Sequence, residues 1–294
     1  MYEPAAWAAV VILVRFGELA LKSRFVRRHL RDRLVANIQD MFAANGAECI
    51  TEADEARIYV HTDDPQKALG ILRRVFGIVS MSPASETRAD LDSLRALAIA
   101  EASGALARGT SFALRVRRTG THSFTSQDLA REIGAAVLAA NPGTRVDLTR
   151  PDVEIHIEAR QSRGFVFREI RRGPGGLPLG SQGRALAFVD GEPGLVAAWL
   201  GMKRGCRVIA AAPKGADPEP LRRWDPHLRI LRVESVQDLP EFVSSTGAEA
   251  VFLGTRWGRF DPASRPGIEV PYFDAVIGLT DEEIAKLAAN IRAA

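Results

Sequence analysis

The stretch from Gly173 to Gly205 constrains this chain more than any other. A glycine-rich segment leads into an apolar run, Ala185 to Val189, and a short turn separates that run from a helix-like one, Leu195 to Arg204. A strand, a tight turn and a helix in this order are how a phosphate-binding loop is built, because the free N–H groups at a helix start favour an anion.

The turn itself, Asp190 to Gly194, has side chains that oppose such a role. Asp190 and Glu192 lie where a phosphate would have to sit, and carboxylates repel phosphate. Pro193 removes one N–H donor. The sequence therefore predicts the backbone of a phosphate loop without its chemistry.

Length and composition indicate an ordinary soluble protein of two or three domains. The chain has 294 residues, of which 46% are hydrophobic and 26% are charged. The apolar segment at the start of the sequence ends at Arg15. This segment is too short for a membrane span and lacks the flanks of a signal peptide, so we expect no membrane association. The two cysteines, Cys49 and Cys206, are far apart and fit a reducing cytoplasm. The five histidines are scattered singly, so we expect neither a metal site nor a catalytic residue pair.

Residues 9–82 predict a small α/β unit in the order βαββα, which suggests a ferredoxin-like domain. Its first helix follows Ser23 and has one apolar face. The other face carries Arg24, Arg27, Arg28, Arg31 and Arg33. Asp32 is the only acid between Arg24 and Arg33, which favours RNA over the alternative of a solvated helix surface.

Residues 84–172 predict a second α/β unit. We expect a helix that follows Asp90 and runs to about Arg108, a strand over Ser111–Arg118 and a helix capped by Ser126. Two further strands are expected over Val153–Arg160 and Phe165–Phe167. Because side chains alternate along a strand, Arg115 and Arg117 fall on the face opposite Phe112, Leu114 and Val116.

The positive charge lies in the front part of the chain. Residues 1–176 hold 25 Lys and Arg against 21 Asp and Glu, whereas the remainder holds 14 against 15. A net excess of this size is modest, so an argument for a polyanion partner depends on clustering.

The last part alternates apolar and helix-like segments, which predicts a doubly wound parallel sheet. The apolar runs are Arg207–Ala212, Leu228–Val233 and Ala250–Gly254, and Thr280 begins a capping box for the last helix.

Four segments resemble successive landmarks of the tRNA 4-thiouridine synthetase (thiamine-pathway sulfurtransferase) family. They are VRFGELALKSR, TSFALRVRRTGTHSFTS, RVDLTRPDVEIHIEAR and GPGGLPLGSQG, in collinear order over most of residues 10–210. The resemblance implies an N-terminal ferredoxin-like domain (1–83), a THUMP domain (84–172) and an ATP-pyrophosphatase-like domain of shortened, doubly wound α/β fold (173–294).

The resemblance also implies that the first two domains bind tRNA, near its acceptor stem and 3′ end in this family. Fixed guanidinium groups suit the phosphate and 2′-OH contacts by which double-stranded RNA is bound. For any single arginine, a solvated or structural ion pair is an equal alternative. The candidate RNA-binding residues are Lys22, Arg24, Arg115, Arg117, Arg118, Arg163, Arg168, Arg171 and Arg172.

Two departures from the family concern catalysis. The family's phosphate loop is Ser-Gly-Gly-x-Asp-Ser, and this chain has Val189-Asp190-Gly191-Glu192-Pro193-Gly194, in which only Gly191 matches. The family's nucleophilic cysteine later in the domain has no counterpart after Cys206, which we interpret as a structural thiol. The loop from Gly254 to Phe260 matches a second nucleotide motif of the family poorly; its arginines and aromatics either stack on a base or pack on the domain.

We therefore expect a tRNA-binding protein that needs no cofactor and lacks sulfurtransferase activity. Its further partners would be an active modification enzyme or a sulfur carrier, and a homodimer stays open. The alternative is a divergent active tRNA sulfurtransferase that uses ATP and Mg²⁺. A third hypothesis is an unrelated nucleotide or anion sensor.

Overall fold

The structure is a computed structural model that describes residues 10–17 and 23–294. The described residues form two compact units. One comprises 10–14, 59–65 and 81–171, and the other comprises 15–17, 23–58, 66–80 and 172–294. Among the described residues, no helix is both long and apolar enough to cross a membrane.

The front of the chain has the expected βαββα order and one strand more. Its elements are β1 (Val10–Phe16), α1 (Arg24–Ala44), β2 (Ile50–Ala53), β3 (Ile58–His61), α2 (Pro65–Leu72) and β4 (Ile78–Arg88). The sequence did not predict β4, because Pro83 interrupts it and proline is rare inside strands. With β4 the order becomes βαββαβ, the complete ferredoxin-like arrangement.

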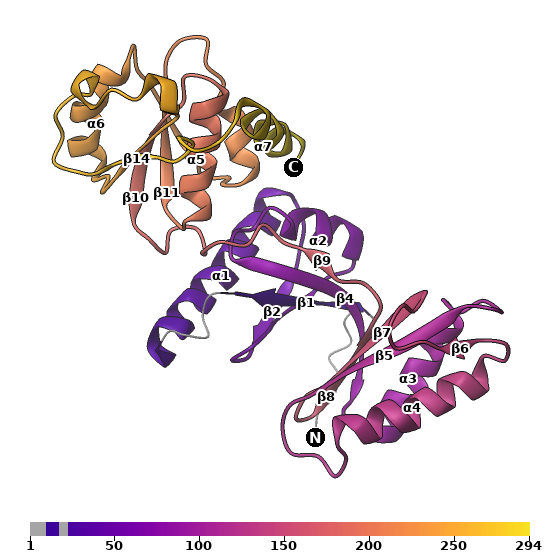
Figure 1. Ribbon diagram of the computed structural model, residues 1–294. Coiled ribbons are helices and arrows are strands. Elements are labelled where there is room, and N and C mark those ends of the chain that lie inside the picture. Colours follow the sequence, from indigo (N-terminus) through magenta and orange to yellow (C-terminus); the bar gives the residue numbers. More distant parts are fainter. Residues whose placement is uncertain (1–9, 18–22) are drawn as a thin grey trace. The chain divides into compact units, whose positions relative to one another are not determined.

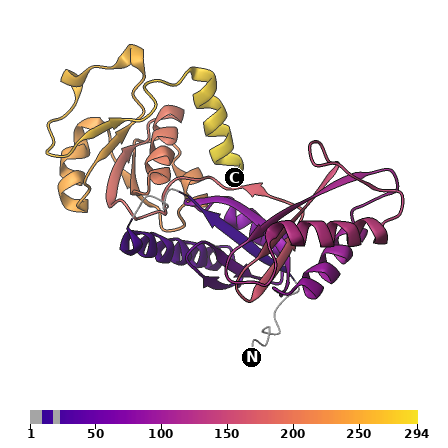
Figure 2. The ribbon, with the colours of Figure 1, turned by 60° about the horizontal axis from the view of Figure 1, so that its bottom comes forward.

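The second α/β unit contributes the rest of a nine-stranded sheet. Its elements are α3 (Leu91–Ser103), β5 (Ser111–Arg118), α4 (Ser126–Ala140), β6 (Arg145–Val146), β7 (Val153–Ala159), β8 (Arg163–Phe167) and β9 (Arg171–Arg172). The strand order is β2-β3-β1-β4-β8-β7-β5-β6, and β9 pairs with β4. Helices α3 and α4 lie side by side along the β5–β7 part of the sheet (Figures 1 and 2).

Two helix boundaries in this unit differ from the prediction. Helix α3 ends at Ser103 rather than near Arg108, because Gly104 follows as its C-cap. The cap of α4 is Thr125 and not Ser126. Thr125 Oγ1 accepts the N–H of Asp128 at 3.1 Å, and Asp128 Oδ2 accepts the N–H of Thr125 at 3.0 Å, which is a capping box.

The C-terminal domain is a doubly wound parallel sheet, as predicted. Its strands are β10 (Arg184–Phe188), β11 (Arg207–Ala212), β12 (Arg229–Arg232), β13 (Val251–Leu253) and β14 (Tyr272–Asp274), in the order β12-β11-β10-β13-β14. The short β14 was not predicted. Helices α5 (Glu192–Lys203) and α7 (Asp281–Ala293) pack together on one face, and α6 (Leu239–Thr246) packs on the other (Figure 1).

Helix α5 begins earlier than the sequence suggested. The predicted turn ran to Gly194, but Gly191 is the N-cap and Glu192 is already helical. Proline is well tolerated in a first turn, so Pro193 starts the helix instead of delaying it. The connection between β10 and α5 is therefore only three residues long.

Three aromatic rings form the centre of the core beneath α5. Phe76 lies 5.1 Å from Trp224 and 5.5 Å from Trp199, and the two tryptophans are 5.3 Å apart. Trp224 Nε1 also donates to the carbonyl of Ile291 in α7 at 3.2 Å. The cluster therefore joins α5, α7 and the segment after α2 in one core.

We expect Trp224→Ala to lower the free energy of unfolding by about 3–5 kcal/mol, because it opens a cavity among packed rings. Urea unfolding followed by circular dichroism measures the loss. The matched control is Phe25→Ala, because Phe25 is 81% exposed, and its change should stay within about 0.5 kcal/mol. Equal losses in the two variants would contradict this account of the core.

Candidate nucleic-acid interface and nucleotide loop

The two faces of the sheet around β5 and β7 differ in chemistry. Phe112, Ile155 and Ile157 point into the core formed with α3 and α4. Arg115 is paired in register with His156, and Arg117 with Glu158. The predicted alternation is confirmed, because the two arginines lie on the face away from the helices.

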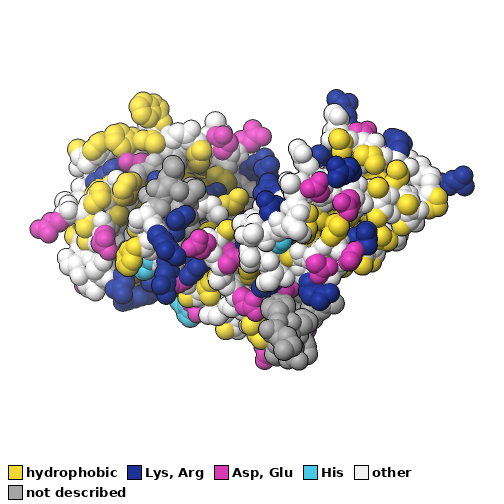
Figure 3. All heavy atoms as spheres, turned by 90° about the horizontal axis from the view of Figure 1, so that it is seen from below, with side chains coloured by type: hydrophobic (Ala, Val, Ile, Leu, Met, Phe, Trp, Pro, Cys, Tyr) yellow, Lys and Arg dark blue, Asp and Glu magenta, His cyan; other side chains and the backbone are white. Residues whose placement is uncertain are grey.

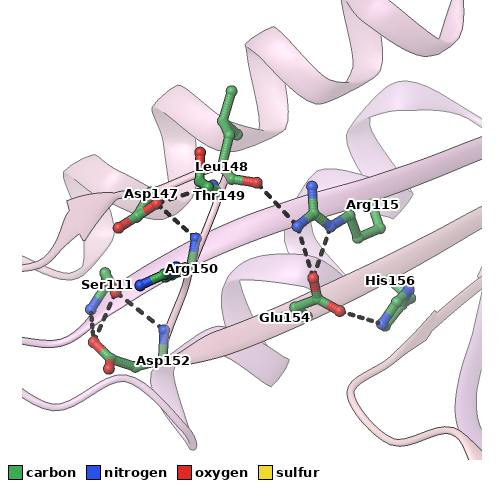
Figure 4. A network of polar contacts seen from close by, with 9 residues as sticks. All are labelled: Ser111, Arg115, Asp147, Leu148, Thr149, Arg150, Asp152, Glu154 and His156. Atoms are coloured by element: carbon green, nitrogen blue, oxygen red, sulfur yellow. Dashed lines mark hydrogen bonds and ion pairs between the residues drawn. The ribbon is translucent and has the colours of Figure 1, made fainter.

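Arg115 is fixed in a polar network, shown in Figure 4. Its Nε donates to Glu154 Oε1 at 2.8 Å, and its Nη2 donates to the Leu148 carbonyl at 3.1 Å. The other oxygen of Glu154 lies 3.5 Å from His156 Nε2, and the His156 ring stacks on Phe167. The charge of Arg115 is thus balanced by Glu154, and its side chain positions the loop before β7.

That loop is held by its own carboxylates. Asp147 Oδ1 accepts the N–H groups of Arg150 and Thr149, both at 2.9 Å, which lowers the pKa of Asp147. Asp152 Oδ2 accepts both the hydroxyl and the N–H of Ser111 at 2.7 Å, and these bonds lower the pKa of Asp152. The loop presents Arg150, which is exposed and has no ion pair with any described residue.

Arg150 was missed by the sequence analysis. The signal was present, because aspartates three residues before and two after Arg150 predict local hydrogen-bonded turns. Only the structure shows that these turns hold Arg150 beside the strand that carries Arg115 (Figure 4).

The other predicted RNA contacts differ in how far their charge is already balanced. Arg117 and Arg118 are exposed and form no ion pair within the described part of the chain; Arg118 donates to the Gly120 carbonyl at 3.1 Å. Arg163 binds both oxygens of Glu86, at 2.6 and 2.7 Å, lies over the Tyr59 ring and is 13% exposed. Its geometry is that of a structural ion pair.

The remaining candidates are surface residues with nearby carboxylates, with one exception. Arg168 lies 3.6 Å from Glu101, Arg171 pairs with Glu169, Arg24 lies 3.2 Å from Glu55, and Arg172 is exposed without an ion pair to a described residue. Lys22 lies outside the described residues.

A separate group of arginines surrounds a hollow at the start of α1. Figure 3 shows Lys and Arg side chains gathered on the left of the molecule in that view. The hollow has a volume of 590 Å³. It is lined by Phe16, Arg24, Phe25, Arg27, Arg28, Arg31 and Glu55. Within the described residues, Asp32 is shared by Arg28 and Arg31, whereas Arg27 has no carboxylate partner.

The predicted nucleotide loop lies where the strand order reverses, between β10 and β13. In open parallel sheets this is the edge at which ligands bind. Here Glu192 pairs with Arg292 of α7 at 2.6 Å, Asp190 is exposed, and the N-cap Gly191 offers no side chain. The start of α5 thus carries two carboxylates, one of them tied to a neighbouring helix.

The loop after β13 closes on the same point. A Cβ at Gly254 would lie only 2.3 Å from the Gly194 nitrogen and 2.5 Å from the Pro193 carbonyl carbon. The two backbones are therefore in direct contact. Further along this loop, Arg256 pairs with Asp281 of α7, and Trp257 is 79% exposed.

Neither cysteine has the lowered pKa that is typical of an activated thiol. Burial raises the pKa of Cys49 to about 11. Burial also raises the pKa of Cys206, with a further contribution from Glu249, and Cys206 Sγ lies 3.7 Å from the Gln182 carbonyl. The described residues contain no group of three or more His, Cys, Asp or Glu side chains that could hold a metal ion.

Comparisons with known proteins agree with the family resemblance. Residues 11–82 match the model of the ThiI ferredoxin-like domain, and residues 88–168 match the THUMP domain. A probable tRNA sulfurtransferase of Methanothermobacter thermautotrophicus is 42% identical over 263 residues, which cover 87% of this chain and 64% of that protein. One of Methanosarcina acetivorans is 42% identical over 206 residues, 67% of this chain and 49% of that protein. The chain spans about half to two thirds of the length of these relatives.

Two solved structures share the fold. The protein PH1313 of Pyrococcus horikoshii Ot3 has a TM-score of 0.83 and 27% identity, and the match covers 96% of this chain and 99% of that one. A 4-thiouridine synthetase bound to RNA and ATP has a TM-score of 0.77 and 19% identity, covering 97% and 85%. With its ThiI ferredoxin-like domain, its THUMP domain and relatives of this kind, the chain belongs to the tRNA sulfurtransferase family.

Proposed function

We propose that this chain binds tRNA through its THUMP and ferredoxin-like domains and does not perform ATP-dependent sulfur transfer. The observation that supports tRNA binding is the row of guanidinium groups along β5. Arg115 and Arg117 share one face and are spaced about 6.6 Å apart, since a strand rises about 3.3 Å per residue. Arg117, Arg118 and Arg150 have no carboxylate partner among the described residues and are exposed to an incoming phosphate.

The start of α5 supports the proposal that the chain does not perform ATP-dependent sulfur transfer. Pro193 lacks an N–H, Glu192 is paired with Arg292, and the backbone of Gly254 occupies the space beside the Gly194 nitrogen. A triphosphate at this edge would meet two carboxylates and lose donors that such a site normally supplies. Both thiols also have a raised pKa, so neither is suited to carry sulfur as a thiolate.

The second candidate is an active tRNA sulfurtransferase that binds ATP and Mg²⁺ through other residues. The observation in its favour is 42% identity to a protein named as a probable tRNA sulfurtransferase.

We expect Arg117→Gln with Arg118→Gln to weaken tRNA binding several-fold and to reduce the salt dependence by about two counterions, because each phosphate contact releases counterions. Binding measured at several salt concentrations tests this. The matched control is Arg95→Gln with Arg131→Gln, which removes the same charge from helices where each arginine pairs with an aspartate. Equal effects of the two pairs would remove Arg117 and Arg118 from the proposal.

Incubation of the chain with tRNA, ATP, Mg²⁺ and sulfide should give neither pyrophosphate nor 4-thiouridine, because no anion cradle receives the phosphates. Replacing residues 189–194 by the family's Ser-Gly-Gly-x-Asp-Ser loop should not restore sulfur transfer, since neither cysteine is activated. Release of pyrophosphate by the unaltered chain that requires both ATP and tRNA would contradict the proposal and favour the active enzyme.

Both cysteines should react slowly with iodoacetamide at neutral pH, because a raised pKa keeps the thiol protonated. The rate at Cys49 should rise with pH and reach half of its maximum near pH 11, the pKa of that thiol. Mass spectrometry of the two cysteine peptides gives each rate, and the urea-unfolded chain, with thiols near pKa 8.5, is the control. Faster alkylation of Cys206 in the folded chain at pH 7 would indicate an activated thiol.

A further inference from the structure

The C-terminal domain has a second concave site, at the end of α5 away from the β10–α5 turn. It is a hollow of 450 Å³ beside β13 and β14. Its floor is apolar and includes Leu200, Phe252, Phe273 and Ala275. Sites for small ligands have this size and an apolar lining with a few polar groups. Helix α5 has 12 residues, so about 16 Å separate this hollow from the turn.

The floor presents a flat aromatic surface. The rings of Phe252 and Phe273 are stacked, with their centroids 5.2 Å apart and an angle of 24° between their planes. Phe252 is 6% exposed, whereas Phe273 is 47% exposed. One ring is therefore anchored in the core, and the other offers part of its surface to a further planar group.

The rim of the hollow is positively charged. Lys203 and Arg204 line it, and neither has an ion pair with a described residue. The Lys203 ammonium lies over the Trp199 ring, 5.2 Å from its centroid, whereas Arg204 is exposed. Among the described lining residues the one acid is Asp274. It pairs with Arg265 at 2.5 Å, and both of these side chains are largely buried. Asp274 is already neutralised, so the hollow keeps an excess of positive charge.

One wall is held in place before any ligand binds. The N–H of Leu177 donates to the Lys203 carbonyl at 3.0 Å. Gly176 has φ of +77°, and a Cβ there would lie 2.1 Å from the same oxygen. Only glycine allows this approach, so the segment is fixed against the end of α5.

We propose that this hollow binds a nucleoside monophosphate, with the base stacked on Phe273 and the phosphate held by Lys203 and Arg204. An exposed ring beside two cations that have no carboxylate partner among the described residues suits a planar group that carries an anion. The ligand is either a free nucleotide or the terminal nucleotide of an RNA, because the two share this chemistry. The site goes beyond the proposed function and does not depend on it.

Equilibrium dialysis of the full chain with AMP tests the inference. We expect saturable binding that Phe273→Ala weakens about tenfold, because stacking on an aromatic side chain contributes roughly that much. Lys203→Gln with Arg204→Gln should weaken AMP about tenfold and leave adenosine unchanged. Trp257→Ala is the control, because it removes a more exposed ring near the β10–α5 turn and should have no effect. Phe273→Leu, which keeps the apolar floor without the ring, replaces Phe273→Ala if that variant unfolds.

Three outcomes would overturn the inference: no saturable AMP binding, no effect of either Phe273 variant, or an equal effect of Trp257→Ala. Competition by a 5′-phosphorylated RNA oligonucleotide would identify the ligand as an RNA end, and its failure to compete would identify it as a free nucleotide. A chain that binds AMP here but not tRNA would refute the proposed function and keep this site. A chain that binds tRNA but shows no saturable AMP binding would refute this site and leave the proposed function unaffected.

Discussion

The first turn of α5 is the point on which the C-terminal domain depends. It follows the central strand β10 and lies against the loop after β13, so it links two neighbouring strands of the sheet. The positive end of a helix favours negative charge, and here Asp190 and Glu192 supply that charge from the chain itself. In a nucleotide site the positive end of such a helix attracts a phosphate. In this chain it attracts the carboxylates of Asp190 and Glu192, and Glu192 also pairs with Arg292.

The arginines in the front part of the chain differ in how far neighbouring carboxylates already balance their charge. Arg163 has a carboxylate partner and aromatic neighbours, so it contributes to the packing of the sheet. Arg115 is intermediate, because Glu154 balances its charge while its guanidinium orders the loop that carries Arg150. Exposed guanidinium groups without such partners are the ones that can neutralise phosphate without first breaking an ion pair.

Much of the fold could be predicted from periodicity and turn chemistry. The amphipathic helix α1, the alternation along β5 and the capping box at Thr280 all follow from local patterns, and the structure has them. Strand β4 was missed because Pro83 breaks its pattern, and β14 was missed because three residues are too few to show one. The start of α5 was placed three residues late because Pro193 was interpreted as part of a turn.

The sequence predicted that basic residues would form the candidate site, but it did not show which of them already have carboxylate partners. Nine basic residues could be named from the sequence, but their ion pairs could not, because Glu86 lies 77 residues before Arg163 and Glu154 lies 39 after Arg115. Arg150 was missed because its position depends on hydrogen bonds between Asp152 and the distant Ser111.

By itself, the sequence determined the order of the domains, their α/β character and the acidic turn before α5, because these depend on residue type and local spacing. The tertiary structure decided which arginines remain unpaired, that Gly254 packs against Gly194, and that two phenyl rings and two cations meet beside β14. Those facts depend on which distant segments become neighbours when strands pair, and local pattern does not contain that information.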